Sequence, residues 1–151
     1  MKRNNPPGGG LIITGSTSSY NGRPNLPLYT TAKHGVIGLM RSVRHNAPED
    51  NINVGVIAPG GTESSAFTVA AANAYREQGV PVNKADSVAL AAVFLAIRKD
   101  MNGKALTIID DKFTEVEDAI LHTQSLWYGE YNTEVAQRSA SVRMDRFAKS
   151  T

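Results

Sequence analysis

Tyr29 and Lys33 are four residues apart in a segment with helical periodicity. On a helix this spacing puts both side chains on one face, with their Cβ atoms roughly 5–6 Å apart. A free phenol has a pKa of about 10. An ammonium group within about 4–6 Å stabilises a phenolate and so lets a phenol exchange protons closer to neutral pH. The pair therefore indicates a tyrosine that works as a general acid and base.

The same spacing also fits a surface helix that carries an amphipathic tyrosine and a solvated lysine. Tyr-x-x-x-Lys occurs by chance in roughly one chain in four of this length, so the pair alone favours the surface alternative. The neighbouring segments must decide between the two.

Ser16 and Pro59-Gly60 each follow a short apolar run, at residues 11–13 and 53–58. The carboxyl ends of parallel strands are where open α/β sheets bind ligands. Ser16 also lies in a Ser/Thr-rich segment, where hydroxyl residues commonly serve as turn residues. A Pro-Gly turn lets backbone amides approach a ligand closely. Together these segments favour a ligand site over a surface helix.

The elements that must position these residues alternate between strand and helix. Apolar runs predict strands at residues 11–13, 53–58 and 105–109. Helical patterns lie between and after them, so the fold class is α/β with a parallel sheet. Three strands make a narrow sheet, and parallel sheets need helices on both faces, so we expect part of a larger layered structure.

The first predicted helix extends from Leu28 to Ala47, with Gly35 and Gly38 on a face that suits close packing of another backbone. Asn83 is interpreted as the N-cap of a second helix. Weak helical character is expected at 62–79, and a last helix at 133–147. Thr114 and Glu117 indicate a capping box before Ile120 and Leu121. The positions expected to face inward are Val36, Met40, Val43, Ala47, Val88, Ala91, Ala92 and Leu95.

Composition narrows the class of protein. The 151 residues suit one domain, and 16 basic against 14 acidic residues leave a net charge of +2. The sequence has no basic stripe with interleaved aromatic residues, so nothing in it indicates nucleic-acid binding. The absence of cysteine excludes disulfides and thiolate metal sites. No apolar stretch is long enough to span a bilayer, and no signal peptide is recognisable. We expect a cytoplasmic protein without nucleic-acid or membrane partners.

Three motifs in order resemble the short-chain dehydrogenase/reductase superfamily. They are Ser16, then Tyr29-Thr-Thr-Ala-Lys33-His-Gly-Val-Ile-Gly-Leu, then Asn53-Val-Gly-Val-Ile-Ala-Pro-Gly60. The resemblance continues through Gly103-Lys-Ala-Leu-Thr-Ile-Ile, and the tail is similar to fungal members. It implies the second half of a Rossmann-type, doubly wound parallel sheet. Residues 1–151 would form one partial domain, with a substrate lid at 62–80 and a C-terminal extension at 112–151.

The resemblance also implies site roles. Tyr29 would transfer the proton, Lys33 would assist it and bond the nicotinamide ribose, and Ser16 would orient the substrate oxygen. Pro59 and Gly60 would begin the turn under the nicotinamide of NAD or NADP. The remaining two matched cofactor positions are Thr62, whose backbone would contact the carboxamide, and Ser64, where the family usually has Thr. Phe67 is the main apolar candidate in the lid.

The Gly-rich turn that binds the pyrophosphate in this family is not found. Gly8-Gly9-Gly10 precedes the first predicted strand and opens no helix. The residue that selects NAD or NADP and the family's catalytic Asn are also missing, since Asn4 and Asn5 lie too close to Ser16. We interpret Met1 as an internal methionine of a longer ancestor. A trimmed chain, a misassigned gene start and a natural truncation remain open.

Two functions follow as expectations. The first is an NAD(P)-dependent oxidoreductase that interconverts a hydroxyl and a carbonyl on a small molecule, with a tilt towards secondary metabolism. It would form a homo-oligomer through the first predicted helix. The alternative is a truncated, inactive remnant that serves as an oligomerisation partner. His34 is interpreted as an ordinary helix-face histidine. The acidic residues at 110–118, with His122, are interpreted as a solvated surface and not a metal site.

Overall fold

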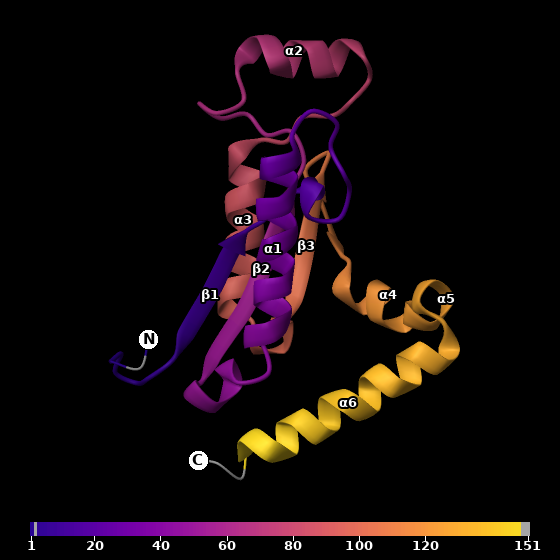
Figure 1. Cartoon of the computed structure of the whole chain (residues 1–151). Coiled ribbons are helices and arrows are strands. Elements are labelled where there is room, and N and C mark those ends of the chain that lie inside the picture. Colours follow the sequence, from indigo (N-terminus) through magenta and orange to yellow (C-terminus); the bar gives the residue numbers. More distant parts are fainter. Residues whose placement is uncertain (2, 149–151) are drawn as a thin grey trace. The chain divides into compact units, whose positions relative to one another are not determined.

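The computed structural model describes residues 1 and 3–148, which divide into two compact units, one that ends at Val116 and one that begins at Glu117. The first unit contains the sheet and the helices against it (Figure 1). Its elements are β1 (Gly9–Thr14), η1 (Thr17–Ser19), α1 (Pro27–Val43), η2 (Ala47–Asp50), β2 (Ile52–Pro59), α2 (Val69–Glu77), α3 (Ala85–Ile97), η3 (Lys99–Met101), β3 (Lys104–Ile109) and β4 (Lys112–Glu115). The second unit comprises α4 (Glu117–His122), α5 (Gln124–Tyr128) and α6 (Glu130–Ala148).

The sheet has the order β1-β2-β3-β4, with the first three strands parallel and β4 antiparallel to β3. The α/β class and the parallel strands are confirmed, but the fourth strand was not expected. Asp110 and Asp111 both have positive φ angles, 56° and 58°, and reverse the chain between β3 and β4. Within the described residues β1 pairs only with β2, so it forms one edge of the sheet.

The predicted capping box is wrong because Thr114 lies in β4 and α4 begins only at Glu117. The expected extension also changes, since Lys112–Glu115 pair with β3 and belong to the first unit. Both differences follow from the two-residue turn at Asp110 and Asp111, which the sequence analysis interprets only as part of a solvated acidic surface.

The core has two halves, one on each face of the sheet. Residues of β2 alternate, so that Val54 and Val56 pack towards α1 while Ile57 packs towards α3. Figure 1 shows α1 and α3 on opposite faces of the sheet. Both faces of the three parallel strands are thereby covered, as parallel sheets require.

Helix α1 ends at Val43, four residues before the predicted end at Ala47. Ala47 is still buried, but it opens the short turn η2, in which Pro48 follows it. Met40 is fully buried on the inward face of α1, as predicted. Ile37 is buried there too, although the sequence analysis does not include it among the inward positions. A side chain at Gly35 or Gly38 would meet nothing within 4 Å, so no backbone of the described chain packs there.

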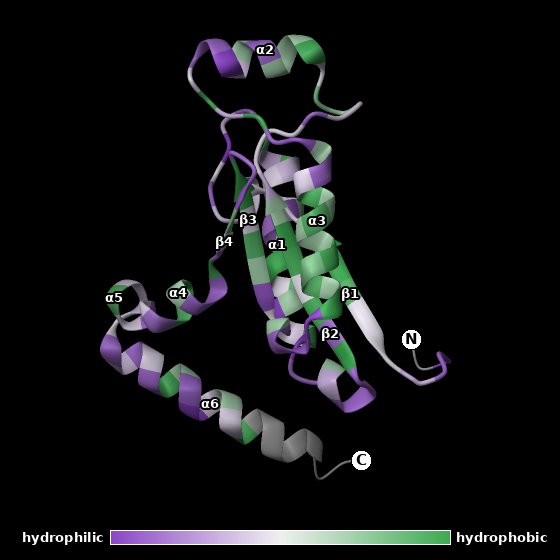
Figure 2. Ribbon diagram, turned by 180° about the vertical axis from the view of Figure 1, so that it is seen from behind, coloured by the Kyte–Doolittle hydropathy of each residue, from purple (hydrophilic) through white to green (hydrophobic). Residues whose placement is uncertain are grey.

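Helix α3 is apolar on almost every side (Figure 2). Ala91 and Leu95 are buried against the sheet, and Val88 and Ala92 pack beside them, which confirms the predicted face. Three large apolar side chains of this helix are nevertheless exposed: Leu90, Val93 and Ile97.

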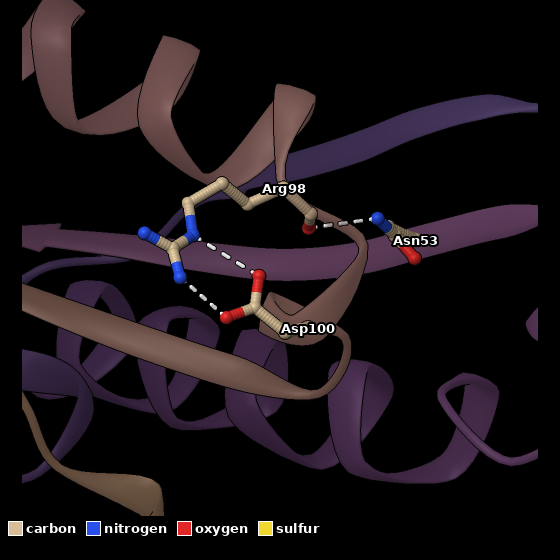
Figure 3. A network of polar contacts seen from close by, with 3 residues as sticks. All are labelled: Asn53, Arg98 and Asp100. Atoms are coloured by element: carbon tan, nitrogen blue, oxygen red, sulfur yellow. Dashed lines mark hydrogen bonds and ion pairs between the residues drawn. The ribbon is translucent and has the colours of Figure 1, made fainter.

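A polar network closes the turn after α3 (Figure 3). The Arg98 carbonyl accepts a hydrogen bond from the Asn53 side chain at 2.9 Å, which ties the turn to β2. The Arg98 guanidinium donates to Asp100, with Nε 3.0 Å from Oδ1. This hydrogen bond lowers the pKa of the Asp100 carboxyl and raises the pKa of Arg98.

The second unit is a run of three helices. Gly129, with φ of 86°, lets the chain turn between α5 and α6. The rings of Trp127 and Tyr128 lie 5.6 Å apart between centroids. Helix α6 has 19 residues and is mostly polar, and none of the helices in the described ranges is both long and apolar enough to cross a membrane.

The β3–β4 turn also holds the start of α3, which gives a pH-dependence to be tested. The Lys84 backbone amide donates to the Asp111 carboxylate at 2.8 Å, and this bond, with a smaller contribution from Ser87, lowers the pKa of Asp111. A carboxyl whose pKa is lowered by folding stabilises the fold above its unfolded pKa of about 3.9 and loses that contribution as the pH falls through the folded value.

We therefore expect Asp111→Asn to be less stable than the wild type at pH 7, with the difference shrinking below about pH 4. Urea unfolding followed by circular dichroism across this pH range measures the difference. Two curves that run parallel down to pH 2 contradict the assignment.

Candidate active site

Tyr29 and Lys33 lie in the first half of α1, as predicted. The Lys33 ammonium donates to the main-chain carbonyl of Thr14, with Nζ 2.9 Å from the oxygen. It also lies 5.6 Å from the centroid of the Tyr29 ring. Tyr29 remains 42% exposed, so its phenol can reach a ligand. The Lys33–Thr14 bond holds the helix against the carboxyl end of β1, where a ligand site was expected.

Ser16 lies two residues after the end of β1 and is only 6% exposed. Its Oγ accepts a hydrogen bond from the Ser18 amide at 3.1 Å, and its own amide donates to Ser19 Oγ at 3.1 Å. These bonds fix the serine as the N-cap of η1. Its hydroxyl proton has no acceptor among the described residues and can be donated to a ligand oxygen. Ser16 is thus both a turn residue and a candidate donor.

Gly15 sets the position of Ser16. A Cβ atom at Gly15 would lie 2.9 Å from Ser19 Oγ and 2.9 Å from Val56 Cγ1, closer than such atoms approach. The Gly15 amide donates to the Ile57 carbonyl at 2.7 Å and extends the pairing with β2. Only glycine lets the chain turn this close to β2.

Pro59 and Gly60 end β2 at the same edge of the sheet. The Gly60 amide donates to the Ile108 carbonyl at 3.0 Å, so it continues the pairing with β3 and does not face a ligand. Thr62 Oγ1 donates to the Gly60 carbonyl at 3.0 Å. Ser64 is exposed farther along the loop. Of the four predicted cofactor contacts at and after the end of β2, Gly60 lines the hollow described below, whereas Pro59, Thr62 and Ser64 do not.

Asn83 holds this edge together, although it was predicted as a helix cap. Helix α3 begins after Lys84, and Asn83 is 1% exposed. Its Nδ2 donates to the Ile108 carbonyl at 2.8 Å, and its Oδ1 accepts from the Asp111 amide at 3.0 Å. Its main-chain amide donates to the Gly61 carbonyl at 2.8 Å. One buried amide therefore joins the loop after β2 to the end of β3 and to the β3–β4 turn.

A hollow of about 330 Å³ opens at the carboxyl edge of the sheet. Thr17 and Ser18 line it from the β1 side, and Gly60 and Gly61 line it from the β2 side. Tyr75 of α2 lines it from the lid region. Ser16, Tyr29 and Lys33 do not line it themselves, although Thr17 and Ser18 follow Ser16 directly in the chain.

Two lining residues, Arg23 and Tyr75, were missed by the sequence reading. Arg23 donates to the Tyr75 hydroxyl, and its guanidinium carbon lies 5.9 Å from the centre of that ring. Phe67, the apolar residue expected in the lid, packs edge-on against Tyr75 at 5.1 Å instead of facing the hollow. Nothing in the sequence of this segment shows that Tyr75, and not Phe67, would line the hollow.

The remaining chemical groups gather into no second site. The exposed His34 ring contacts the Thr30 carbonyl, 2.9 Å from Nδ1. Across residues 1 and 3–148, no group of three or more His, Asp or Glu side chains could hold a metal ion. The second unit has a hollow of about 430 Å³ between α5 and α6, lined by Tyr128 and Tyr131 among others. It contains no charged side chain, so we assign the chemistry to the first unit.

The residues present fit one end of a nicotinamide dinucleotide. An ammonium has three donors, and Lys33 uses one of them on Thr14, which leaves donors for ribose hydroxyls. The described residues do not fit the pyrophosphate of the dinucleotide in the same way. Gly8 and Gly9 have positive φ angles of 130° and 147°, but they lie at the amino end of β1 and not between a strand and a helix. They do not form a pyrophosphate turn.

Known proteins resemble the chain over most of its length. Residues 1–75 match the family described as short chain dehydrogenase. The short-chain dehydrogenase/reductase prx4 of Penicillium roqueforti is 27% identical over 153 residues, covering 89% of this chain and 46% of that protein. The 5'-hydroxyaverantin dehydrogenase of Dothistroma septosporum is 25% identical over 141 residues, covering 89% of this chain and 45% of the relative.

A solved structure from Agrobacterium tumefaciens, provisionally named 2-deoxy-D-gluconate 3-dehydrogenase and carrying NADP, is 30% identical with a TM-score of 0.61. The match covers 67% of this chain and 45% of that one. The chain thus spans less than half the length of these relatives.

The buried amide of Asn83 can be tested directly. Asn83→Ala leaves the Asp111 amide without its partner and removes one of the two hydrogen bonds to the Ile108 carbonyl, which keeps the bond from the Gly60 amide. We expect this to cost about 1–3 kcal/mol of unfolding free energy. Asn73→Ala, on the exposed side of α2, serves as the control and should change it by less than about 0.5 kcal/mol. Urea unfolding measures both variants. A cost at Asn83 no larger than at Asn73 contradicts the role assigned to the amide.

Proposed function

The chain belongs to the short-chain dehydrogenase/reductase superfamily, and from this membership we propose that it carries the proton-transfer residues of an NAD(P)-dependent oxidoreductase. The reaction interconverts a hydroxyl and a carbonyl group on a small molecule. The observation that carries the proposal is the Lys33 ammonium, which bonds the end of β1 and faces the ring of an exposed tyrosine.

Each residue has a separate task in this proposal. Tyr29 accepts the hydroxyl proton of an alcohol, or donates one to the oxygen of a carbonyl. Lys33 stabilises the phenolate by its charge and binds the ribose with its remaining donors. Ser16 donates its hydroxyl proton to the substrate oxygen and orients it. A bound nicotinamide would supply the hydride chemistry at the carbon that bears this oxygen, and Lys33 would hold its ribose.

The loop after β2 would hold the cofactor's nicotinamide end. Pro59 and Gly60 shape the turn, and the Thr62 hydroxyl fixes it through the Gly60 carbonyl. Thr62 and Ser64 remain the proposed contacts for the carboxamide. We extend the proposal to secondary metabolism, because the tail resembles fungal members and fungal relatives cover 89% of the chain.

A second role, association with another copy, rests on the outer face of α1. Leu28 is 86% and Leu39 is 55% exposed on this helix. Nothing in the described chain lies within 4 Å of a Cβ at Gly35 or Gly38, so a second helix can approach closely at these two positions. We propose a homo-oligomer formed through this face. An inactive chain that only associates with such a copy is the alternative to the enzyme.

Replacement of Tyr29 separates these functions. Tyr29→Phe removes the hydroxyl, and because the ring is retained at a half-exposed position the fold should be kept. We expect turnover of a panel of secondary alcohols and ketones with NAD(H) or NADP(H) to fall about 10²–10⁴-fold, as for loss of a general acid and base. Nicotinamide absorbance measures the rate. Tyr131→Phe, on exposed α6, is the matched control and should leave it unchanged.

Near wild-type turnover in Tyr29→Phe overturns the assigned mechanism. If the wild type neither turns over the panel nor changes NAD(P)H fluorescence, the chain is not an autonomous enzyme and the association role remains.

The association role predicts an effect of charge on α1. Leu39→Glu places a carboxylate on the proposed interface and should raise the dissociation constant of the oligomer at least about tenfold. Leu126→Glu, at an 84% exposed position of α5, is the control. Sedimentation equilibrium measures both. A monomeric wild type, or an equal loss in both variants, rules out this interface.

A further inference from the structure

The hollow at the carboxyl edge of the sheet has one charged residue in its lining, and that residue is a cation. Arg23 lies in the loop between η1 and α1, at the mouth of the hollow. Its described partner is the hydroxyl and ring of Tyr75, both of which are neutral. A guanidinium held by a neutral phenol keeps donors and charge available for an anion.

The nearby carboxylates do not compensate this charge. Glu63, in the loop after β2, is paired with Arg76 of α2. Asp110, next to the lining residue Ile109, is paired with Lys112 at 2.7 Å. Among the described residues no carboxylate pairs with Arg23. The hollow therefore has a local positive charge, although these neighbouring ion pairs are balanced.

Four further residues of the lining are apolar or aromatic. Tyr75 presents its ring, and Val80, Pro81 and Ile109 add aliphatic surface. Phe67 supports the Tyr75 ring from behind by its edge-on contact at 5.1 Å. Such a wall suits a flat ring system, while the backbone at Gly60 and Gly61 leaves room for it beside the sheet.

We propose that this hollow binds an anionic aromatic compound, with the carboxylate or another acidic oxygen at Arg23 and the ring against Tyr75. The inference rests on the proposed function, in which such a compound is the substrate and Ser16, the residue before the lining residues Thr17 and Ser18, orients its oxygen. Arg23 is then the residue that selects acidic over neutral substrates. The planar guanidinium fits a carboxylate through two parallel hydrogen bonds, which an ammonium does not reproduce.

The test uses the whole 151-residue chain, labelled with ¹⁵N, and two probes of matched shape. Sodium 2-naphthoate carries the anion, and 2-naphthalenemethanol is its neutral counterpart. Backbone amide shifts of Gly22, Gly60 and Gly61, which line the hollow, report binding. We expect saturable shifts at these amides and a dissociation constant for 2-naphthoate roughly tenfold lower than for the alcohol.

Two arginine variants give the inference its specificity. Arg23→Gln should bring the two probes to within about twofold of each other. Arg76→Gln, which removes an arginine already paired with Glu63 and outside the hollow, should keep the preference for the anion. Equal binding of both probes by the wild type, an unchanged preference in Arg23→Gln, or no shift with either probe overturns the inference.

The outcome is separable from that of the proposed function, because binding of the probe requires neither cofactor nor proton transfer. Tyr29→Phe should bind 2-naphthoate like the wild type. A preference for the anion in a chain without turnover refutes the enzyme and keeps the anion site. Turnover that depends on Tyr29, without a preference for the anion, supports the enzyme and refutes the anion site.

Discussion

The arrangement of the candidate site depends on a buried amide. Asn83 is 1% exposed and forms hydrogen bonds to the loop after β2, to the end of β3 and to the β3–β4 turn. Strand pairing alone does not join these three segments. Parallel pairing brings the strands to one edge, but it does not determine how the chain continues beyond them. A buried amide with unmet donors and acceptors is costly, so the loop after β2 and the β3–β4 turn must both close on Asn83. The walls of the hollow follow from that closure.

Lys33 has a comparable positioning role on the β1 side of the site. Its ammonium donates one hydrogen bond to the end of β1, which holds α1 there, and it lies 5.6 Å from the centroid of the Tyr29 ring. The residue proposed to assist proton transfer is thus also the one that positions the tyrosine. Gly15 adds a steric constraint, because its neighbours Ser19 and Val56 leave no room for a side chain beside the candidate serine.

The α/β class, the three parallel strands and the inward face of α3 were predictable, because apolar runs and helical periodicity report burial directly. The fourth strand was not. Two consecutive aspartates look like a solvated tail, and only their left-handed backbone reveals a turn. The predicted cap role of Asn83 is wrong for a related reason. An asparagine side chain can cap a helix locally or bond distant segments, and the sequence does not show which of the two it does. Arg23 and Tyr75 are 52 positions apart in the sequence, a separation that no local pattern reports.

The two edges of the sheet are unequal. Strand β4 is short and carries charged residues at both its ends, Lys112 and Glu115, which discourages another strand from pairing there. The outer side of β1 has no such protection within the described residues, and its peptide groups can template a further strand. Addition of a further strand is therefore favoured at the β1 edge of this sheet and disfavoured at the β4 edge.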